Sequence, residues 1–185
     1  MLWIVLAVLA VVVVGAVLIY NSLVALRNRA AGAWSDIDVQ LKRRHDLVGN
    51  LVETVKGYAT HERETLAQVT EARTRAEAAS GSGDPRAAGQ AESALTAQLR
   101  TIFALAEAYP DLKANQNFQE LQRSLESLED ALQNARRYYN AVVRDFNTKI
   151  QSVPDMLIAR PFGFTEREFF ELSDPTEAQV PKVRF

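Results

Sequence analysis

Residues 2–20 read LWIVLAVLAVVVVGAVLIY, and this stretch decides the organisation of the chain. The eighteen residues that begin with Leu2 carry no charged side chain. As an α-helix they span roughly 27 Å, close to the thickness of the hydrocarbon core of a bilayer. Trp3 and Tyr20 lie near the two ends, where amphipathic aromatic residues meet the membrane interface. The sequence therefore predicts a transmembrane anchor over residues 1–20.

A cleaved secretory signal is the alternative explanation for an apolar N-terminus. A signal has a basic segment, a shorter apolar core and small residues at its cleavage site. Here no charged side chain precedes the run, and the bulky Tyr20 and Leu23 follow it, so we expect the segment to be retained. Basic residues lie only after it, starting with Arg27 and Arg29. The positive-inside rule therefore favours a cytoplasmic location for the rest of the chain, in a single-pass protein of the cell membrane.

The composition limits the classes of function. About 165 residues follow the anchor, enough for one domain with a hydrophobic core. The 21 basic and 23 acidic residues nearly balance, which argues against a nucleic-acid partner. The chain has no cysteine, which excludes disulfides, thiol catalysis and cysteine-bound metals.

The first part of the domain has a helical pattern without interruption. No proline occurs between residues 21 and 79, and apolar residues recur every three or four positions. We therefore expect one helix over residues 21–79, with a kink at Gly49 beside Asn50 because both have poor helix propensity. The apolar positions are Trp34, Ile37, Leu41, Val48, Leu51, Val55, Tyr58, Leu66 and Val69.

The segment Ser80–Gly89, SGSGDPRAAG, is the clearest break in the chain. Asp84 before Pro85 is typical of a helix start, with a capping carboxylate before a residue already fixed in helical φ. A second helix is expected over residues 85–108, ending where Tyr109 precedes a proline.

A third helix is expected over residues 116–152, with Asn115 as its N-cap. Its apolar residues alternate in steps of three and four, as in a coiled coil or the seam of a bundle. They are Phe118, Leu121, Leu125, Leu128, Leu132, Ala135, Tyr139, Val142 and Phe146. The rest of the chain, residues 154–185, is rich in phenylalanine and is expected to form a short helix or an extended arm.

These elements predict an all-α fold, an antiparallel bundle of long helices over residues 21–153 with the C-terminal arm as a lid. The first helix is much longer than the second. We therefore expect part of its apolar stripe, from Trp34 to Leu41, to lack a partner in the same chain and to contact a second chain.

Three stretches of the sequence carry a family resemblance: AWSDIDVQLKRRHDLVGNLVETVKGYATHE (residues 33–62), YPDLKANQNFQELQ (109–122) and RRYYNAVVRDFNTKIQSVPDMLIARPFGF (136–164). They resemble the LemA family of bacterial membrane proteins, and the terminal FFELSDPTEAQVPKVRF extends the likeness. The resemblance implies one N-terminal transmembrane helix and a helical bundle, usually in the cytoplasm, but no activity. Relatives in magnetosome biogenesis, and family genes beside membrane-protease genes, suggest membrane organisation or an adaptor role.

Two positions differ from the family pattern. Gly49 stands where many members have proline, and His45 where many have tyrosine. A bend at this point is therefore expected to be kept by different chemistry.

Catalytic and metal-binding patterns are absent from the sequence. His45 and His61 are the only histidines, and their spacing does not suit a metal site on one helix. Asp38 lies four residues before Lys42, which favours ion pairing along a helix over acid–base chemistry. No phosphate-binding loop, nucleophile elbow or metalloprotease motif occurs. We therefore expect no enzymatic activity, metal or cofactor.

Polar residues on the apolar stripes are candidates for setting the register of helices. Arg44 falls on the first stripe, and a charge there can fix register at some cost in stability. Asn140 and Asn147 follow the aromatic residues of the third stripe one heptad apart. They either set register between chains or bind polar groups of a crowded surface within the chain.

Two hypotheses of function follow. The first is a non-catalytic structural protein that self-associates laterally and organises membrane or clusters membrane proteins. Its interface would comprise Trp34, Ile37, Leu41, Arg44, Asn140, Asn147, Phe162, Phe164 and Phe185. The second is a monomeric adaptor for a membrane protease or another envelope protein. In both the partners are the lipid bilayer and proteins.

Overall fold

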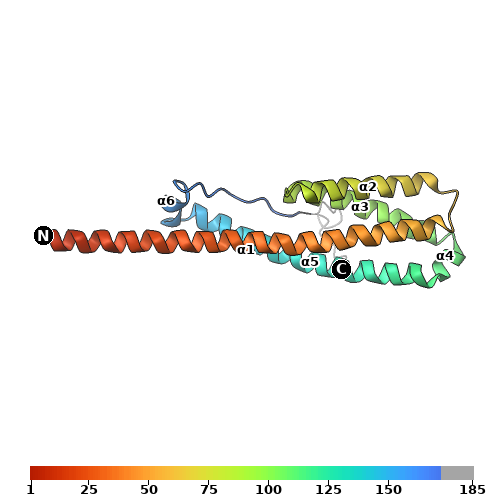
Figure 1. Cartoon of the computed structure of the whole chain (residues 1–185), viewed down its shortest axis with the longest axis horizontal. Helices are drawn as coiled ribbons and strands as arrows, with labels where there is room; N and C mark the ends of the chain where they lie inside the picture. Colours follow the sequence, from red (N-terminus) through yellow and green to blue (C-terminus); the bar gives the residue numbers. More distant parts are fainter. Residues whose placement is uncertain (172–185) are drawn as a thin grey trace, which may run out of the picture. The chain divides into compact units, whose positions relative to one another are not determined.

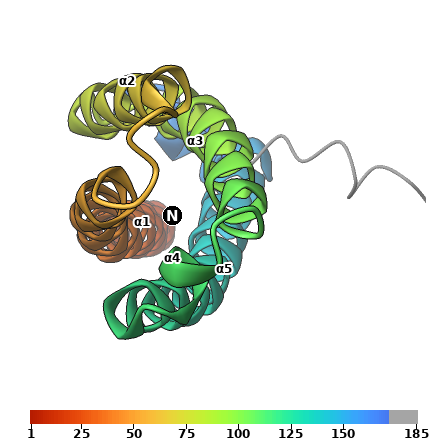
Figure 2. The ribbon, with the colours of Figure 1, turned by 90° about the vertical axis from the view of Figure 1, so that its right-hand side faces the viewer.

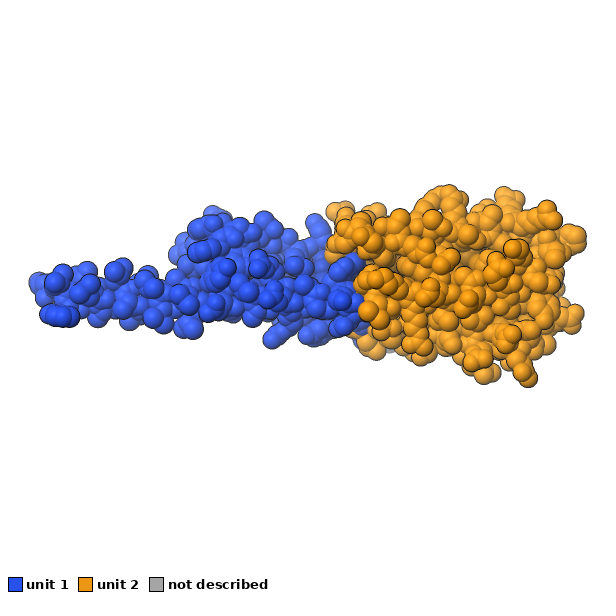
Figure 3. All heavy atoms as spheres, viewed as in Figure 1, with its two compact units in different colours: residues 1–36, 135–169 blue, residues 37–134, 170–185 orange. Residues whose placement is uncertain are grey.

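The computed structural model describes residues 1–171 of the chain. All regular elements in this range are helices, as expected (Figure 1). In chain order they are α1 (Leu2–Lys56), α2 (Arg63–Gly81), α3 (Pro85–Ala106), α4 (Pro110–Ala114), α5 (Gln116–Gln151) and α6 (Asp155–Ala159). The chain divides into two compact units, coloured separately in Figure 3, and both α1 and α5 contribute residues to each. Unit 1 contains residues 1–36 and 135–169, and unit 2 contains residues 37–134 and 170–185.

Helix α1 is 55 residues long and carries the predicted membrane span. None of the side chains in its most apolar window is buried, so this surface is open to a lipid environment. The helix continues through Gly49, where the guanidinium of Arg73 lies 3.4 Å from the position that a Cβ atom would take.

The prediction of one helix over residues 21–79 was wrong, because α1 ends at Lys56 and α2 begins at Arg63. Gly57 follows α1, and the buried Ala59 accepts a backbone hydrogen bond from Glu62 within the turn. The turn places Leu66 and Val69 of α2 in the same core as residues of α1. One long apolar stripe thus folds back on itself, because two half-length stripes can bury each other whereas a straight helix leaves both exposed.

The connection between α2 and α3 forms as the sequence indicated. Gly83 has a φ of 72°, a conformation that glycine adopts without steric cost. The Asp84 carboxylate accepts hydrogen bonds from the backbone N–H groups of Arg86 and Ala87 at 2.9 and 3.2 Å. Asn115 caps α5 by accepting from the N–H of Phe118 at 3.0 Å. Both predicted N-caps are therefore confirmed, whereas the short helix α4 was not anticipated.

Unit 2 has its own hydrophobic core among α2, α3, α4 and the parts of α1 and α5 that belong to it (Figure 2). The fully buried residues include aliphatic side chains from each of the first four helices, and α5 adds Phe118 and Leu125. The core members from α1 to α4 that are fully inaccessible are Val48, Leu51, Val55, Val69, Ala76, Leu95, Ile102 and Leu112.

Unit 1 has a separate core where α1 leaves the predicted span. Leu23 of α1, Phe146 and Ile150 of α5, Ala159 of α6 and Phe164 of the arm are buried together. Beyond α6 a turn over residues 160–163 leads into a segment without regular secondary structure to residue 171, so a short helix and an arm occur in succession.

Candidate functional site

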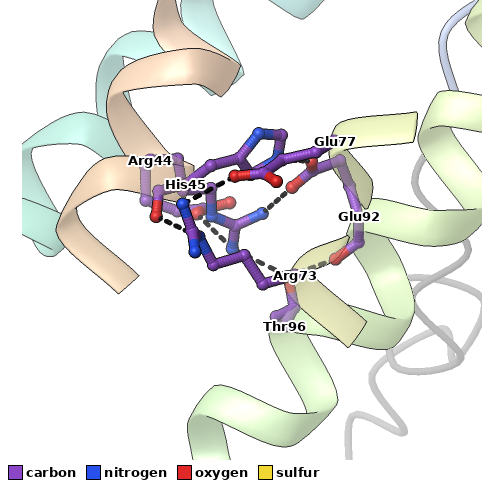
Figure 4. A network of polar contacts seen from close by, with 7 residues as sticks. Arg44, His45, Arg73, Glu77, Glu92 and Thr96 are labelled. Carbon is purple, nitrogen blue, oxygen red and sulfur yellow. Dashed lines mark hydrogen bonds and ion pairs between the residues drawn. The ribbon is translucent and has the colours of Figure 1, made fainter. Parts of the chain in front are cut away.

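The most polar cluster of unit 2 is built around Glu92, whose side chain is inaccessible to solvent. One carboxylate oxygen accepts from the Arg44 guanidinium at 2.6 Å, and the other lies 2.6 Å from Nε2 of His45 (Figure 4). Arg44 also donates to the Thr96 hydroxyl at 2.8 Å and pairs with Glu129 of α5 at 3.0 Å. The cluster therefore connects α1, α3 and α5.

Helix α2 joins the same cluster through Arg73. Its Nε donates to the backbone carbonyl of His45 at 2.7 Å, and its terminal nitrogen pairs with Glu77 at 2.7 Å (Figure 4). Every helix longer than five residues in unit 2 thus contributes at least one member.

This arrangement suits a structural role more than a chemical one. Both oxygens of Glu92 already have partners, and Arg44 and His45 are almost completely buried. A general acid or base must reach a substrate, and none of these groups is accessible to one. Among the residues that the structure describes, no three histidine, aspartate or glutamate side chains are grouped as metal ligands are. Asp38 pairs with Lys42 at 2.9 Å, as its spacing indicated.

Glu92 was missed by the sequence analysis, although a signal for it exists. It falls on the apolar stripe of α3, between Ala88 and Leu95, at helical spacing. Arg44 occupies the same kind of position on α1. A single acid and a single base, each alone on a buried stripe, indicate a buried ion pair, because each needs a partner of opposite charge once it leaves water.

In unit 1, the arm is held by polar side chains of α5. Asn147 donates to the carbonyl of Arg167 and accepts from the N–H of the same residue, both at 2.9 Å. The Tyr139 hydroxyl donates to the Glu168 carbonyl at 3.0 Å. Burial is the main cause that raises the pKa of Tyr139, while the nearby Arg167 lowers it to a smaller extent. Of the two readings of Asn147, the contacts within the chain match the one in which it binds polar groups of its own chain.

In unit 2, the end of the described arm lies against α3. The carbonyl oxygen of Glu171 would be 2.1 Å from a Cβ atom at Gly89. Only glycine allows this approach without movement of the arm. Phe170, the preceding residue, is completely buried.

The expectation that the stripe from Trp34 to Leu41 lacks a partner in its own chain was wrong. Ile37 and Leu41 are completely buried, and the half-buried Trp34 lies with its ring centroid 5.5 Å from that of Tyr139. The sequence argument compared the first helix with the second, whereas the longer α5 also covers α1.

The remaining predicted interface residues have different environments. Asn140 is half-buried. Phe164 is buried between Phe146 and Tyr20, while Phe162 is exposed and rests on Tyr20 with ring centroids 4.9 Å apart. Phe185 lies outside the described residues.

Comparison with known proteins finds relatives that are similar to most of this chain. The Magnetosome protein MamQ 2 of Paramagnetospirillum magneticum is 26% identical over 193 residues, covering 90% of this chain and 71% of the relative. The Magnetosome protein MamQ of Magnetospirillum gryphiswaldense is 24% identical, covering 82% of this chain and 64% of the relative. The Protein LemA of Metamycoplasma hominis is 25% identical, covering 86% of this chain and 72% of the relative. The model of the LemA family matches residues 33–185, and the chain therefore belongs to the LemA family.

Proposed function

We propose that this chain is a non-catalytic, membrane-anchored structural protein that self-associates laterally and organises membrane or clusters membrane proteins. The observation that carries the proposal is α1, in which an exposed apolar span continues without a break into a helical bundle. Helix α1 runs from the anchor into the bundle as one continuous helix, so no flexible linker separates the two. Two relatives with the printed name Magnetosome protein support a role at membranes.

The contacts between copies must use surfaces that the monomer leaves open. Ile37, Leu41 and Arg44 are buried in the interior of the chain. They therefore stabilise the bundle and do not face a neighbouring copy. The open surfaces of α1 are its span and the exposed side that includes Gly32 and Val39. Helices in membranes associate through close packing of such surfaces, because lipid supplies no hydrophobic drive. We therefore place the self-association mainly in the span.

The mass of the purified protein tests this proposal. The full-length protein in mild detergent should give a discrete assembly by light scattering, after the detergent is subtracted. A chain beginning at Asn21 should be monomeric, because it lacks the span but keeps the buried members of both cores and loses only Ile19 and Tyr20 from the edge of the core in unit 1. Circular dichroism checks that the shorter chain is folded. A full-length monomer contradicts self-association.

The adaptor hypothesis remains the second candidate, and one observation favours it. Because Ile37 and Leu41 are buried within the chain, the stripe from Trp34 to Leu41 does not require a second copy to cover it. An adaptor would be monomeric in detergent and would co-purify in fixed stoichiometry with a heterologous membrane protein. Mixed tagged and untagged copies separate the two candidates, since only self-association lets the tag capture the untagged chain.

A further inference from the structure

Unit 1 exposes an apolar surface that its core does not explain. Val153, Leu157 and Phe162 are 71%, 63% and 61% exposed, and they fall within ten residues of each other around α6. Beyond the span, the other large apolar side chains that are exposed in residues 21–171 are scattered, at Val39, Tyr58 and Tyr138. Two of these carry hydroxyl groups. Clustered apolar exposure of this kind usually marks an interaction surface.

The surface lies where the predicted span ends. The ring of Phe162 packs on Tyr20, the last residue of the predicted anchor. Ile19 and Leu23, on either side of Tyr20, pack in the cluster that contains Ala159 of α6. Figure 1 accordingly shows α6 beside α1, toward its N-terminal part. The fold thus returns a segment more than one hundred residues distant to the point where the span leaves the hydrocarbon layer.

A glycine turn keeps the two phenylalanines on opposite sides. Gly163 has a φ of 70°. The N–H of Gly163 donates to the carbonyl of Arg160, and the N–H of Phe164 donates to the carbonyl of Ala159. This double hydrogen bond is the Schellman motif, which ends a helical turn with a left-handed residue. Because the backbone reverses at Gly163, Phe164 enters the core while Phe162 stays outside.

We propose that α6 and its glycine turn form a second membrane contact, in which Val153, Leu157 and Phe162 enter the phospholipid leaflet where the span ends. Phe162 contacts Tyr20 at the end of the span, and Ala159 of α6 packs in the same cluster as Ile19 and Leu23, so an anchored span holds α6 at the depth of the headgroup and acyl boundary. Apolar side chains at that depth leave water for lipid.

The charges around α6 are compatible with this depth. Asp155, the acidic residue of α6, pairs with Lys149 at 2.8 Å, which compensates its charge. Arg160 is exposed, and Arg27 lies over the Phe164 ring at 5.3 Å. Arginine side chains with apolar stems lie favourably at an interface, with their charged ends among phosphate groups.

A second contact changes how the anchor is held. A lone apolar helix can rotate about its own axis in the bilayer, whereas interfacial anchors on one side fix its rotation and tilt. The contact on α6 would therefore present one constant side of unit 1 to neighbouring molecules. The proposal rests on membrane anchoring, and it holds whether the protein is an assembly or a monomer.

Single-cysteine labelling tests the contact, because the native chain has no cysteine. Full-length Leu157→Cys, labelled with an environment-sensitive nitrobenzoxadiazole dye, is reconstituted into phosphatidylcholine vesicles. Val17→Cys in the span is the lipid-exposed control, and Tyr138→Cys in unit 1 is the water-exposed control. All three side chains are exposed, so the substitutions preserve the core. Nitroxide groups on the upper part of the lipid acyl chains serve as the quencher.

We expect the emission at position 157 to be blue-shifted and to lose most of its intensity when the lipid carries nitroxide, as at position 17 but not at position 138. Emission like that of position 138 overturns the proposal. A blue shift without quenching by nitroxide lipid also overturns it, because the dye then lies against protein, as a subunit contact at Phe162 would require. Self-association is tested separately by the mass of the protein in detergent. A failure of the membrane contact at α6 can therefore be distinguished from a failure of self-association.

Discussion

At the scale of single residues, the bundle depends on a few buried polar side chains. The desolvation of Arg44 and Glu92 is offset only if both are present with their hydrogen bonds. Such a pair contributes little net stability compared with an apolar pair, but it penalises every alignment of α1 and α3 in which the two charges miss each other. The main contribution of the Arg44–Glu92 pair is therefore to fix the register of α1 and α3.

Substitution of the two carboxylates that contact Arg44 tests this interpretation. Glu92→Gln should lower the free energy of unfolding by about 3 kcal/mol or more, because it removes the fully buried carboxylate and leaves the buried arginine with only the partly exposed Glu129 as a counter-ion. Glu129→Gln is the matched control, and since the Glu129 side chain is 46% exposed its loss should cost less than about 1 kcal/mol. Chemical denaturation followed by circular dichroism measures both. Equal losses would show that burial does not decide the strength of these contacts.

Tyr139 makes the stability of the protein sensitive to alkaline pH. Its pKa is raised in the folded state from 10.0, mainly by burial, so the folded chain keeps the proton when the unfolded chain has lost it. The contribution of Tyr139 to the free energy of unfolding is complete below pH 10, and it is lost as the pH rises through the pKa of Tyr139 in the folded state. Thermal unfolding between about pH 8 and pH 11 should therefore show a smaller alkaline decrease for Tyr139→Phe than for the unchanged protein. An unchanged slope would contradict this role, although Tyr109, whose pKa is also raised by burial, leaves some decrease in both.

At the scale of elements, the arm after α6 is fixed by side chains of helices and not by a sheet. Asn147 forms two hydrogen bonds with the backbone of Arg167 in unit 1. In unit 2, Gly89 of α3 admits the carbonyl of Glu171. The helical asparagine thus supplies hydrogen bonds that a neighbouring strand would otherwise give, and the helical glycine supplies the space for a close approach.

Gly89→Ala should displace the end of the arm from α3. The added methyl group would overlap the Glu171 carbonyl, and overpacking of this kind costs about 1–3 kcal/mol. Gly81→Ala in α2 is the control, because nothing lies within 4 Å of its Cβ position and alanine is the better helix former. Limited proteolysis should cleave the arm of Gly89→Ala faster, and equal cleavage of both variants would contradict the contact.

At the scale of the whole molecule, the chain combines an anchor, a hydrophobic core in each of its two units and a buried polar cluster. We propose an orientation in the membrane from the charges near the anchor, since the basic residues Arg27 and Arg29 follow the span. This proposal places the bundle in the cytoplasm.

A cysteine at Ser82, in the exposed turn between α2 and α3, tests the orientation. We expect Ser82→Cys to resist a membrane-impermeant maleimide in intact cells and to react after the cells are opened. The reaction of lysed cells is the control for accessibility. Labelling of intact cells would place the bundle outside.

The sequence by itself determined the features that depend on neighbours along the chain. The span, the caps at Asp84 and Asn115 and the stripe of α5 follow from runs, spacings and local hydrogen bonds. The turn after Lys56 could not be found in this way, because no proline marks it and the apolar spacing continues on both sides. That turn is favoured only by the burial that α1 and α2 give each other once they are folded.

Tertiary structure alone decided what each stripe residue contacts. It buried Ile37 and Leu41, for which the sequence analysis expected a second chain, because α5 also lies along α1. It joined Arg44 to Glu92, 48 residues apart, and brought Phe162 to Tyr20 at the end of the span. The apolar periodicity predicts which side of a helix is buried. It does not predict what covers that side, because the hydrophobic effect is non-directional and the partner depends on how elements distant in the sequence pack.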